Sequence, residues 1–315
     1  MKEINPYYSV VVPTYNEAGN IEKLDKEIKS AMSKLGTPFE IIYINDGSTD
    51  DTLSVLKSIK NVTVLDMNRN YGQSTAIDAG FKMARGEFVI SIDGDGQNDP
   101  KDIPLLIEKM DTEQLDVVAG WRKVRNDSKK IKVLTRIGRL LRRIIISDTV
   151  HDSGCTFRLY RKEAVKSLDL QGEMHRYILA LLRWKGFTIG EVVVNDRARV
   201  YGKSAYNITK AVRGLIDLLF IWFIHKYSQR PLHIFGYLSI LVFVLGTAFM
   251  AYATYQKLFL GMGINRSGHF LLGAFSMLTS IVLFSFGLVI DLLIKIHLNN
   301  SPYEKRYYIR ARYDQ

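Results

Sequence analysis

The sequence predicts an α/β fold with a doubly wound, mostly parallel sheet, followed by interfacial helices and two transmembrane helices. Three observations support this. Short apolar segments alternate with segments of helical length over residues 8–119, which is the pattern of strand–helix units in a parallel sheet. Polar residues follow three of the apolar segments directly. Two long runs without Asp, Glu, Lys or Arg occupy the C-terminal part of the 315-residue chain.

The strand segments are short apolar runs, several of them rich in β-branched residues, and turn residues follow them. Strands are expected at residues 8–12, 39–44, 62–65, 88–92 and 115–119. The helix segments between them are amphipathic or rich in small residues. Helices are expected at 20–34, from the caps Thr49 and Asp50 to Ile59, and at 74–84.

Two carboxylates and an amide follow the strand at 88–92. On an extended backbone Asp93 and Asp95 point to the same side, and Gly94 leaves room for a ligand to approach the backbone. Together with Gln97 they supply hard oxygen ligands, which suit Mg²⁺ or Mn²⁺, and such ions usually also hold substrate phosphates. The alternative is an acidic turn that caps the next helix.

Polar side chains also follow the first two strands. Tyr15 and Glu17 come after the first strand, and Asp46 comes after the second. Parallel sheets bind ligands beyond the carboxyl ends of their strands. Each of these residues alone could be a turn residue, but acids at three successive strand ends predict one shared pocket.

The formal net charge of +11 is concentrated in one segment. Between residues 121 and 145 there are ten Lys or Arg against a single acid, Asp127. Nucleic acid and an anionic membrane surface are the two partners that such a segment fits. Residues 131–146 predict a basic amphipathic helix of the kind that lies on anionic membranes, although an ordinary solvated helix face is the alternative.

The two uncharged runs decide between these partners. Residues 232–255 and 270–290 are long enough to cross a hydrocarbon core of about 30 Å. Basic residues flank both runs on the side of the N-terminal domain, which predicts a plasma-membrane protein with a cytoplasmic catalytic domain and no nucleic-acid partner. Gly and Ser in both runs suit close helix packing and permit a homo-oligomer. The expected divisions are an α/β domain at 1–206, an interfacial helix at 207–230, the spans at 231–298 and a basic cytoplasmic tail at 299–315.

The single cysteine, Cys155, excludes an internal disulfide framework and a Cys-rich zinc site. We expect it to be a small packed residue rather than a nucleophile.

Four motifs occur in order over residues 8–100: Val-Val-Pro-Thr-Tyr-Asn-Glu, Asn-Asp-Gly-Ser-Thr-Asp, Asn-Tyr-Gly-Gln-Ser-Thr-Ala and Asp-Gly-Asp-Gly-Gln-Asn-Asp-Pro. The set resembles the family 2 glycosyltransferases with a GT-A fold. Within them it resembles the polyprenyl-phosphate glycosyltransferases, a group that includes dolichyl-phosphate mannose synthase and bacterial undecaprenyl-phosphate glucosyltransferases. The resemblance implies that Asp93, Asp95 and Gln97 hold the metal on a diphosphate. It implies a nucleotide-sugar pocket lined by Pro13, Tyr15, Glu17, Asp46, Asp93 and Gly94.

The second half of the domain carries looser similarities. Gly-Trp-Arg at 120–122 resembles a family region in which Arg122 faces a phosphate, and Lys132 and Arg136 are candidates for holding the phosphate of the acceptor. The loop that begins at Arg199 resembles the family's Arg-x-x-Gly-x-Ser loop, which implies a clamp on the donor diphosphate. Many relatives have Lys after that Ser, where this chain has Ala205.

Asp152 begins a stretch that resembles the family signature Asp-x-x-x-x-Phe-Arg, which implies a base at the acceptor site. A phosphate monoester has a second pKa of about 6 and is already largely dianionic, so a base adds little. Asp152 therefore orients the nucleophile or holds an arginine, unless it is an ordinary turn acid. His175 lies in a region that borders the sugar in this family, and a structural histidine is an equal expectation.

The resemblance implies an enzyme that transfers a sugar from a nucleotide-sugar such as UDP-glucose to undecaprenyl phosphate. Transfer is expected at the cytoplasmic membrane face, with inversion and with Mg²⁺ or Mn²⁺, and Asp95, Arg122 and Asp152 are the expected catalytic set. One alternative is a processive polysaccharide synthase, which needs more spans and a Gln-x-x-Arg-Trp motif that the sequence lacks. The other is a non-catalytic scaffold with the same fold, and the acids at three strand ends argue against it.

Overall fold

The computed structural model describes residues 5–123, 143, 150–170, 172–198, 218, 222–223, 226, 231–261, 268–300 and 309–314. The helix expected at 131–146, with Lys132 and Arg136, lies almost wholly outside these residues, as do Arg199 and most of the interfacial segment 207–230. The chain folds as two units. One comprises Met1–Leu218 together with Lys305–Gln315, and the other is Leu219–Glu304.

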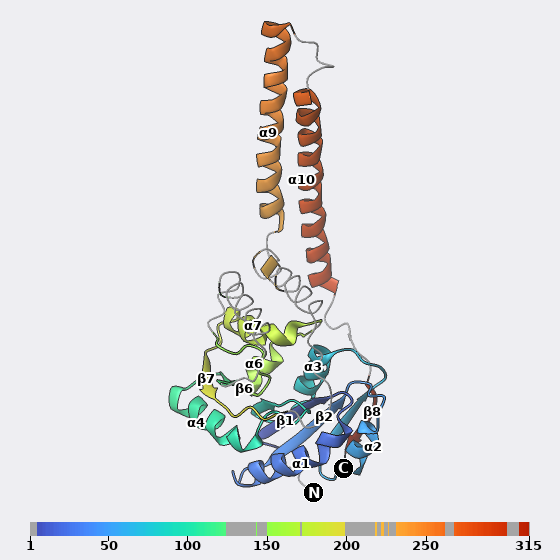
Figure 1. The fold of residues 1–315 in the computed structure, drawn as a ribbon, viewed down its shortest axis with the longest axis vertical. Helices are drawn as coiled ribbons and strands as arrows, with labels where there is room; N and C mark the ends of the chain where they lie inside the picture. Colours follow the sequence, from blue (N-terminus) through green and yellow to red (C-terminus); the bar gives the residue numbers. More distant parts are fainter. Residues whose placement is uncertain are drawn as a thin grey trace. The chain divides into compact units, whose positions relative to one another are not determined.

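An eight-stranded sheet forms the centre of the first unit within the described part of the chain (Figure 1). Its strand order is β7-β5-β6-β4-β1-β2-β3-β8. The strands are β1 (Tyr8–Thr14), β2 (Phe39–Asn45), β3 (Thr63–Met67), β4 (Phe88–Ser91), β5 (Val117–Trp121), β6 (Arg158–Arg161), β7 (Ile189–Val193) and β8 (Ile309–Asp314).

Most strand pairs are parallel, as the sequence predicts. β1 lies between β2 and β4 in parallel register, so that Val11 is flanked by Ile42 and Ser91. β2 also pairs in parallel with β3, and β5 pairs in parallel with β7. β6 is the exception inside the sheet, because it runs antiparallel between β4 and β5. The carboxyl ends of β1, β2, β4 and β5 therefore meet at one edge.

Helices cover both faces of the sheet, and alternate residues of each strand enter two separate cores. Val10 and Val12 of β1 face one core, whereas Val11 faces the other. The first core is closed by α1 (Ala18–Ser33), α2 (Thr52–Ser58) and α4 (Ile103–Glu113). The second is closed by α3 (Gln73–Met83), α6 (Lys162–Lys166) and α7 (Ile178–Trp184). Two short 3₁₀ segments, η1 (Pro100–Asp102) and η2 (Met174–Tyr177), precede α4 and α7.

Most of the expected boundaries differ from the observed ones by one or two residues, and two of these differences have a clear local cause. Helix α2 begins at Thr52 rather than directly after Thr49 and Asp50, because the Asp50 carboxylate accepts hydrogen bonds from the Thr52 N–H and hydroxyl in a local turn. β4 ends at Ser91, and Gly94 and Asp95 already lie in a turn. Asp93 and Asp95 are thus not neighbours on an extended strand.

The C-terminal segment contains a strand rather than only a basic tail. β8 pairs antiparallel with β3 and closes that edge of the sheet, with Val64 opposite Tyr313. Thr63 Oγ1 donates to Asp314 Oδ1 at 3.0 Å, and Lys57 Nζ lies 4.2 Å from the centre of the Tyr313 ring. The chain therefore returns to the first unit after its apolar segments.

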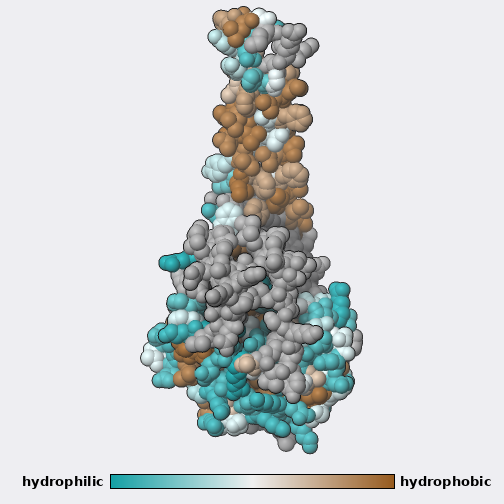
Figure 2. Space-filling view, in the orientation of Figure 1, coloured by the Kyte–Doolittle hydropathy of each residue, from teal (hydrophilic) through white to brown (hydrophobic). Residues whose placement is uncertain are grey.

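The second unit is a hairpin of two long apolar helices, α9 (Pro231–Leu260) and α10 (Gly268–Asn300), which lie side by side (Figure 1). Leu232–Leu260 and Gly268–Leu293 are both long and apolar enough to cross a membrane. Only 11% and 17% of their most apolar windows are buried, so they are not core helices of a water-soluble domain. Figure 2 shows the hydrophobic surface of these helices and the mainly hydrophilic surface of the sheet unit.

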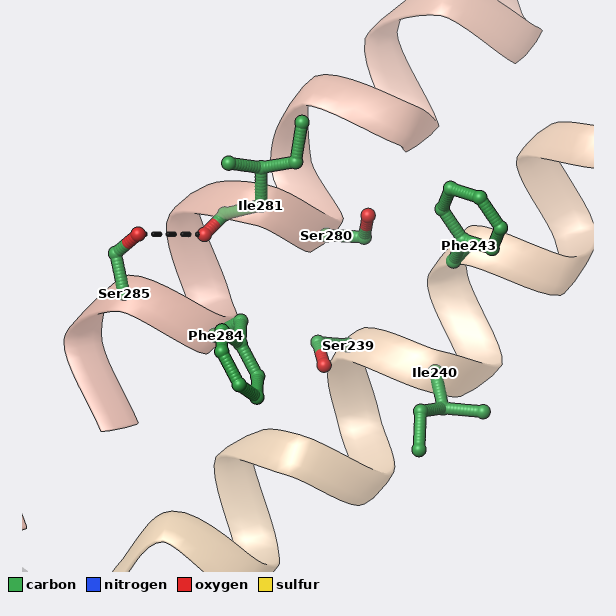
Figure 3. Close-up of a pocket in the computed structure, with 7 residues that line it drawn as sticks. All are labelled: Ser239, Ile240, Phe243, Ser280, Ile281, Phe284 and Ser285. Carbon is green, nitrogen blue, oxygen red and sulfur yellow. Dashed lines mark hydrogen bonds between the residues drawn. The ribbon is translucent and has the colours of Figure 1, made fainter. Parts of the chain in front are cut away.

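Small residues let the two helices approach closely at two levels, one at Gly246 and Gly273 and the other at Gly287, which lies against Leu232 and Phe235. A Cβ at Gly273 would lie 2.7 Å from Met250 and 3.1 Å from the Gly246 carbonyl oxygen, whereas a Cβ at Gly236 would meet nothing within 4 Å. The hairpin also contains a groove of about 270 Å³ (Figure 3). Its serine hydroxyls are bonded to carbonyls of their own helices, for example Ser285 to Ile281, and the groove is therefore largely apolar.

Candidate active site

The loops after β1 and β2 are bound to each other through backbone and side-chain hydrogen bonds. The Asn16 N–H donates to Ser48 Oγ at 3.0 Å, and Asn16 Oδ1 accepts from the Thr49 N–H at 2.8 Å. The Glu17 N–H donates to Thr52 Oγ1 at 2.8 Å. These contacts place the first two sequence motifs side by side at the carboxyl edge of the sheet.

Three of the expected pocket residues lie in or beside these loops. Pro13 is buried in β1, Tyr15 is 45% exposed, and Glu17 precedes α1. The Glu17 carboxylate accepts a hydrogen bond from Asn20 at 2.6 Å. Tyr15 is therefore the side chain of this group that is most open to a ligand.

Asp46 holds the loop that leads into α3. Its two carboxylate oxygens accept from the N–H groups of Tyr71 and Gly72 at 2.7 and 2.9 Å. Burial raises the pKa of Asp46, and the two N–H groups act in the opposite direction. Gly72 has a φ of +93°, a conformation that glycine adopts without strain. Asp46 thus fixes the position at which α3 begins.

The first residue of α3 connects this loop to the acids after β4. Gln73 Nε2 donates to Asp93 Oδ1 at 2.8 Å. Gly94 lies against the end of β1, since a Cβ there would stand 2.8 Å from Thr14 and 3.0 Å from the Pro13 carbonyl oxygen. The third and fourth sequence motifs are therefore in contact with the first two.

Asp93 and Asp95 lie close enough to repel each other. Burial and the charge of Asp95 raise the pKa of Asp93 to about 6, and the positive charges of Arg122 and Arg158 act in the opposite direction. Asp95 Oδ1 accepts from the Gln97 N–H at 3.0 Å, which shapes the turn. The amide nitrogen of Gln97 points to the Arg197 carbonyl oxygen at 3.5 Å.

This donor set fits a hard divalent cation. A dication would relieve the repulsion between the two carboxylates, and an amide oxygen is a compatible further ligand. No group of three or more His, Cys, Asp or Glu side chains that could form a metal site occurs in the described ranges. A cation here would accordingly need oxygens from a bound ligand or from water to complete its coordination.

Arg122 and Asp152 form a bidentate ion pair beside these acids. Arg122 Nε and Nη2 donate to the two carboxylate oxygens at 2.8 and 3.2 Å, and the Arg122 N–H adds a longer contact of 3.4 Å. Asp152 is buried and Arg122 is largely buried. Burial acts to lower the pKa of Arg122, but the hydrogen bond and the charge of Asp152 outweigh burial and raise that pKa above its ordinary value. Of the expected roles for Asp152, holding an arginine is the one that this geometry displays.

His175 and Arg197 are also held by contacts with other residues of the protein. Ser74 Oγ lies 2.8 Å from His175 Nδ1 and accepts from the His175 N–H at 3.0 Å, and burial lowers the pKa of His175 to about 3. This neutral, buried ring is a structural histidine. Arg197 pairs with Glu27 and Asp99 at 2.6 and 2.5 Å. Cys155 is buried, and burial raises the pKa of its thiol to about 11.

The structure thus links Asp46, the start of α3 at Gln73, and Asp93 by hydrogen bonds along the sheet edge. The Arg122–Asp152 pair lies near enough for the charge of Arg122 to act on Asp93. Gln73 is a site residue that sequence reasoning missed, although it lies inside the third motif. Glu191 was also missed, because only the pairing of β7 with β5 brings it to this region, whereas Arg158 is the arginine of the Asp-x-x-x-x-Phe-Arg signature. Arg199, Lys132 and Arg136 lie outside the described residues.

Comparisons with known proteins agree with this architecture. Residues 9–169 match the family described as glycosyl transferase family 2. A dodecaprenyl-phosphate galacturonate synthase of Rhizobium johnstonii is 32% identical over 314 residues, covering 97% of this chain and 93% of that protein. An undecaprenyl-phosphate 4-deoxy-4-formamido-L-arabinose transferase of Klebsiella pneumoniae is 32% identical over 272 residues, covering 84% and 81%.

A solved structure shares the fold of the sheet unit. Glucosyl-3-phosphoglycerate synthase of Mycobacterium tuberculosis, crystallised with Mn²⁺, UDP and phosphoglyceric acid, superposes with a TM-score of 0.56 at 21% identity. The match covers 69% of this chain and 78% of that chain. The fold and site therefore define a GT-A glycosyltransferase domain joined to an apolar helical hairpin. The chain belongs to glycosyl transferase family 2, and its similarity to polyprenyl-phosphate glycosyltransferases extends over almost its full length.

Proposed function

We propose that the protein transfers a sugar from a UDP-sugar to the phosphate of a membrane polyprenol, with inversion at the anomeric carbon. The observation that carries this is the meeting of two groups at one sheet edge. The paired acids Asp93 and Asp95 suit a nucleotide diphosphate with its cation, and the Arg122–Asp152 pair beside them suits a second phosphate. The names of the two relatives above support a polyprenyl-phosphate acceptor for this family branch.

Asp93, Asp95 and Gln97 would hold Mg²⁺ or Mn²⁺ at the donor end. When bound, the cation neutralises charge that develops on the leaving diphosphate. Fold neighbours crystallised with Mn²⁺ or Mg²⁺ and UDP support this choice of ion. Asp93 is already fixed by Gln73, so the chain presents its acids in place before the donor arrives.

The nucleotide would lie over the loops after β1 and β2. Tyr15 is exposed there and Glu17 is half-buried beside it, whereas Pro13 and Gly94 are buried against each other and would support this surface from within. We assign Asp46 a supporting role, because both of its carboxylate oxygens are bonded to the loop before α3. Arg199 remains the proposed clamp on the donor diphosphate.

At the acceptor end, Arg122 would offset the repulsion between the incoming phosphate and the donor diphosphate, together with Lys132 or Arg136. A phosphate oxygen attacks the anomeric carbon as the bond from that carbon to the diphosphate oxygen breaks, and the nucleoside diphosphate leaves. The acceptor monoester is largely dianionic at neutral pH, so no strong base is required. Asp152 then serves by holding the guanidinium of Arg122 in position.

The hairpin would bring the enzyme to an acceptor that stays in the bilayer. Two spans place the residues before α9 and after α10 on the same side of a membrane, and the pairing of β8 with β3 requires that arrangement. The excess of Lys and Arg in the flanking segments favours the cytoplasmic side.

A donor panel tests this proposal. Purified full-length protein is incubated with undecaprenyl phosphate, Mn²⁺ and, one at a time, UDP-glucose, UDP-galacturonate, UDP-4-deoxy-4-formamido-L-arabinose and GDP-mannose. The lipid is then weighed by mass spectrometry. We expect one of the UDP-sugars to add the mass of a single glycosyl residue. A lipid of unchanged mass with every donor would overturn the proposal.

A further inference from the structure

Glu191 of β7 makes a set of contacts that neither the motifs nor the reaction scheme assigns. Its side chain is only 15% exposed. One oxygen, Oε1, accepts from the His151 N–H at 2.9 Å and from the Asp152 N–H at 3.4 Å. The other, Oε2, accepts from the same His151 N–H at 3.1 Å and lies 2.9 Å from His151 Nδ1. One carboxylate thus engages two successive backbone amides and an imidazole.

The contact between the Glu191 carboxylate and the imidazole indicates which ring nitrogen of His151 carries a hydrogen. An ionised carboxylate only accepts, so His151 Nδ1 carries the proton of this bond. The imidazole also stacks on the Trp121 indole, with ring centres 4.3 Å apart and planes 17° from parallel. Glu191 and Trp121 therefore hold the ring of His151 from two sides.

The contacts form a closed circuit around the Arg122–Asp152 pair. β7 pairs in parallel with β5, and Ala119 of β5 lies beside Glu191. Arg122 follows β5 and bonds the Asp152 carboxylate, while Glu191 bonds the backbone of Asp152. The position of Asp152 is thus set from its backbone by one strand and from its side chain by the neighbouring one.

We propose that Glu191 is a positioning residue, which fixes the backbone at residues 151–152 so that Asp152 presents Arg122 to the phosphate of the acceptor. This inference rests on the proposed function. A carboxylate suits the task because all of the groups that face it are N–H donors, and charged acceptors make the stronger hydrogen bonds. Glutamine at this position would turn an NH₂ group toward at least one of those donors.

The test compares Glu191→Gln with Glu108→Gln, a change at an exposed residue of α4 outside this circuit. KM for undecaprenyl phosphate and KM for the UDP-sugar are measured separately, and UDP binding reports on folding. We expect Glu191→Gln to raise the acceptor KM by about tenfold or more, with donor KM and UDP binding within about twofold of wild type. If Glu191 had a purely structural role, the substitution would instead raise KM for both substrates or abolish UDP binding. That result would overturn the inference.

A double-mutant cycle gives the second readout. If Glu191 acts through Asp152, adding Glu191→Gln to Asp152→Asn costs less than about threefold further activity, because the geometry is already lost. Two outcomes would overturn this inference and leave the proposed function standing. In the first, the activity losses of the two single variants multiply fully in the double variant. In the second, Glu191→Gln behaves like Glu108→Gln. An inactive wild-type protein would instead overturn the proposed function and, with it, this assignment.

Discussion

Asp152 and Arg122 illustrate how the site residues act as connected groups rather than as separate charges. Each oxygen of Asp152 is bonded to a guanidinium nitrogen, and the backbone of Asp152 is bonded to Glu191. Asp93 is likewise fixed by Gln73. Such ordering before binding lowers the entropic cost of reaching a reactive geometry. It also means that a substitution at one position is felt by its neighbours.

Asp95→Asn is expected to reduce sugar transfer by about a hundredfold or more while the protein stays folded. The change removes one of two carboxylates that face the proposed cation, and Asp95 lies in a turn after β4 rather than in either core. Transfer rate and thermal unfolding are measured together, with Asp111→Asn on α4 as a control. Wild-type transfer by the Asp95 variant would exclude this carboxylate from the donor site.

His175 makes a prediction about acid stability. Its pKa is about 3 in the folded protein and 6.5 in the unfolded chain, so the unfolded chain binds more protons between these values. The neutral imidazole of His175 therefore leaves the folded protein at its full stability above pH 6.5, and this stability is progressively lost as the pH falls toward 3. Between pH 7 and pH 5 this one group should lower the free energy of unfolding by about 2 kcal/mol. His175→Asn should flatten that slope in detergent-solubilised protein, and an unchanged slope would contradict the assignment.

The sequence marks the candidate site residues but not the residues that support them. Asp93, Asp95, Arg122 and Asp152 are candidates because they occur in recognisable local patterns. Glu191 reaches the site through pairing of β7 with β5, a register that no local pattern encodes. The expectation that Asp93 and Asp95 share an extended strand is wrong, because the chain turns directly after β4, yet the turn still keeps the two charges close.

At the level of elements, the first four strands and the helices between them are predictable because apolar periodicity and turn residues mark each one. β6 has the sequence Arg-Leu-Tyr-Arg, with a charged residue at each end, and it inserts antiparallel between parallel strands. β8 lies in a segment whose composition suggests a tail. Its place is set by the open edge of β3, which otherwise would leave unpaired backbone groups.

Tyr313→Ala tests whether β8 protects that edge. The ring packs against the first core and lies under Lys57, so its loss should weaken the β8–β3 pairing. We expect faster hydrogen exchange at residues 63–67, with exchange in β1 unchanged. Leu105→Ala, at an exposed site on α4, is the matched control. Equal protection of residues 63–67 in both variants would show that β8 contributes little to the edge.

For the whole molecule, the two units have complementary tasks. In the proposed function the sheet unit would gather the donor and acceptor phosphates, and the hairpin presents apolar surface suited to lipid. If the two apolar helices span a membrane, the return of the chain to β3 through β8 puts both ends of the hairpin on the same side. Orientation is then a single binary question, whether the sheet unit faces the cytoplasm or the other side.

Cysteine labelling answers that question. The native Cys155 is buried and burial raises the pKa of its thiol to about 11, so it should react slowly and leave a clean background. We expect a membrane-impermeant maleimide to label Leu260→Cys, at the end of α9, in intact cells. Glu163→Cys, on α6 of the sheet unit, should be labelled only after permeabilisation. The opposite pattern would reverse the proposed orientation.

The central claim is that a divalent cation at Asp93 and Asp95 enables transfer of a sugar to a lipid phosphate. The most direct measurement is the mass of undecaprenyl phosphate after incubation, in vesicles, with wild-type protein and the active UDP-sugar. The product should appear with Mn²⁺, disappear with excess chelator and return when Mn²⁺ is restored. Undiminished product in excess chelator would contradict the claim.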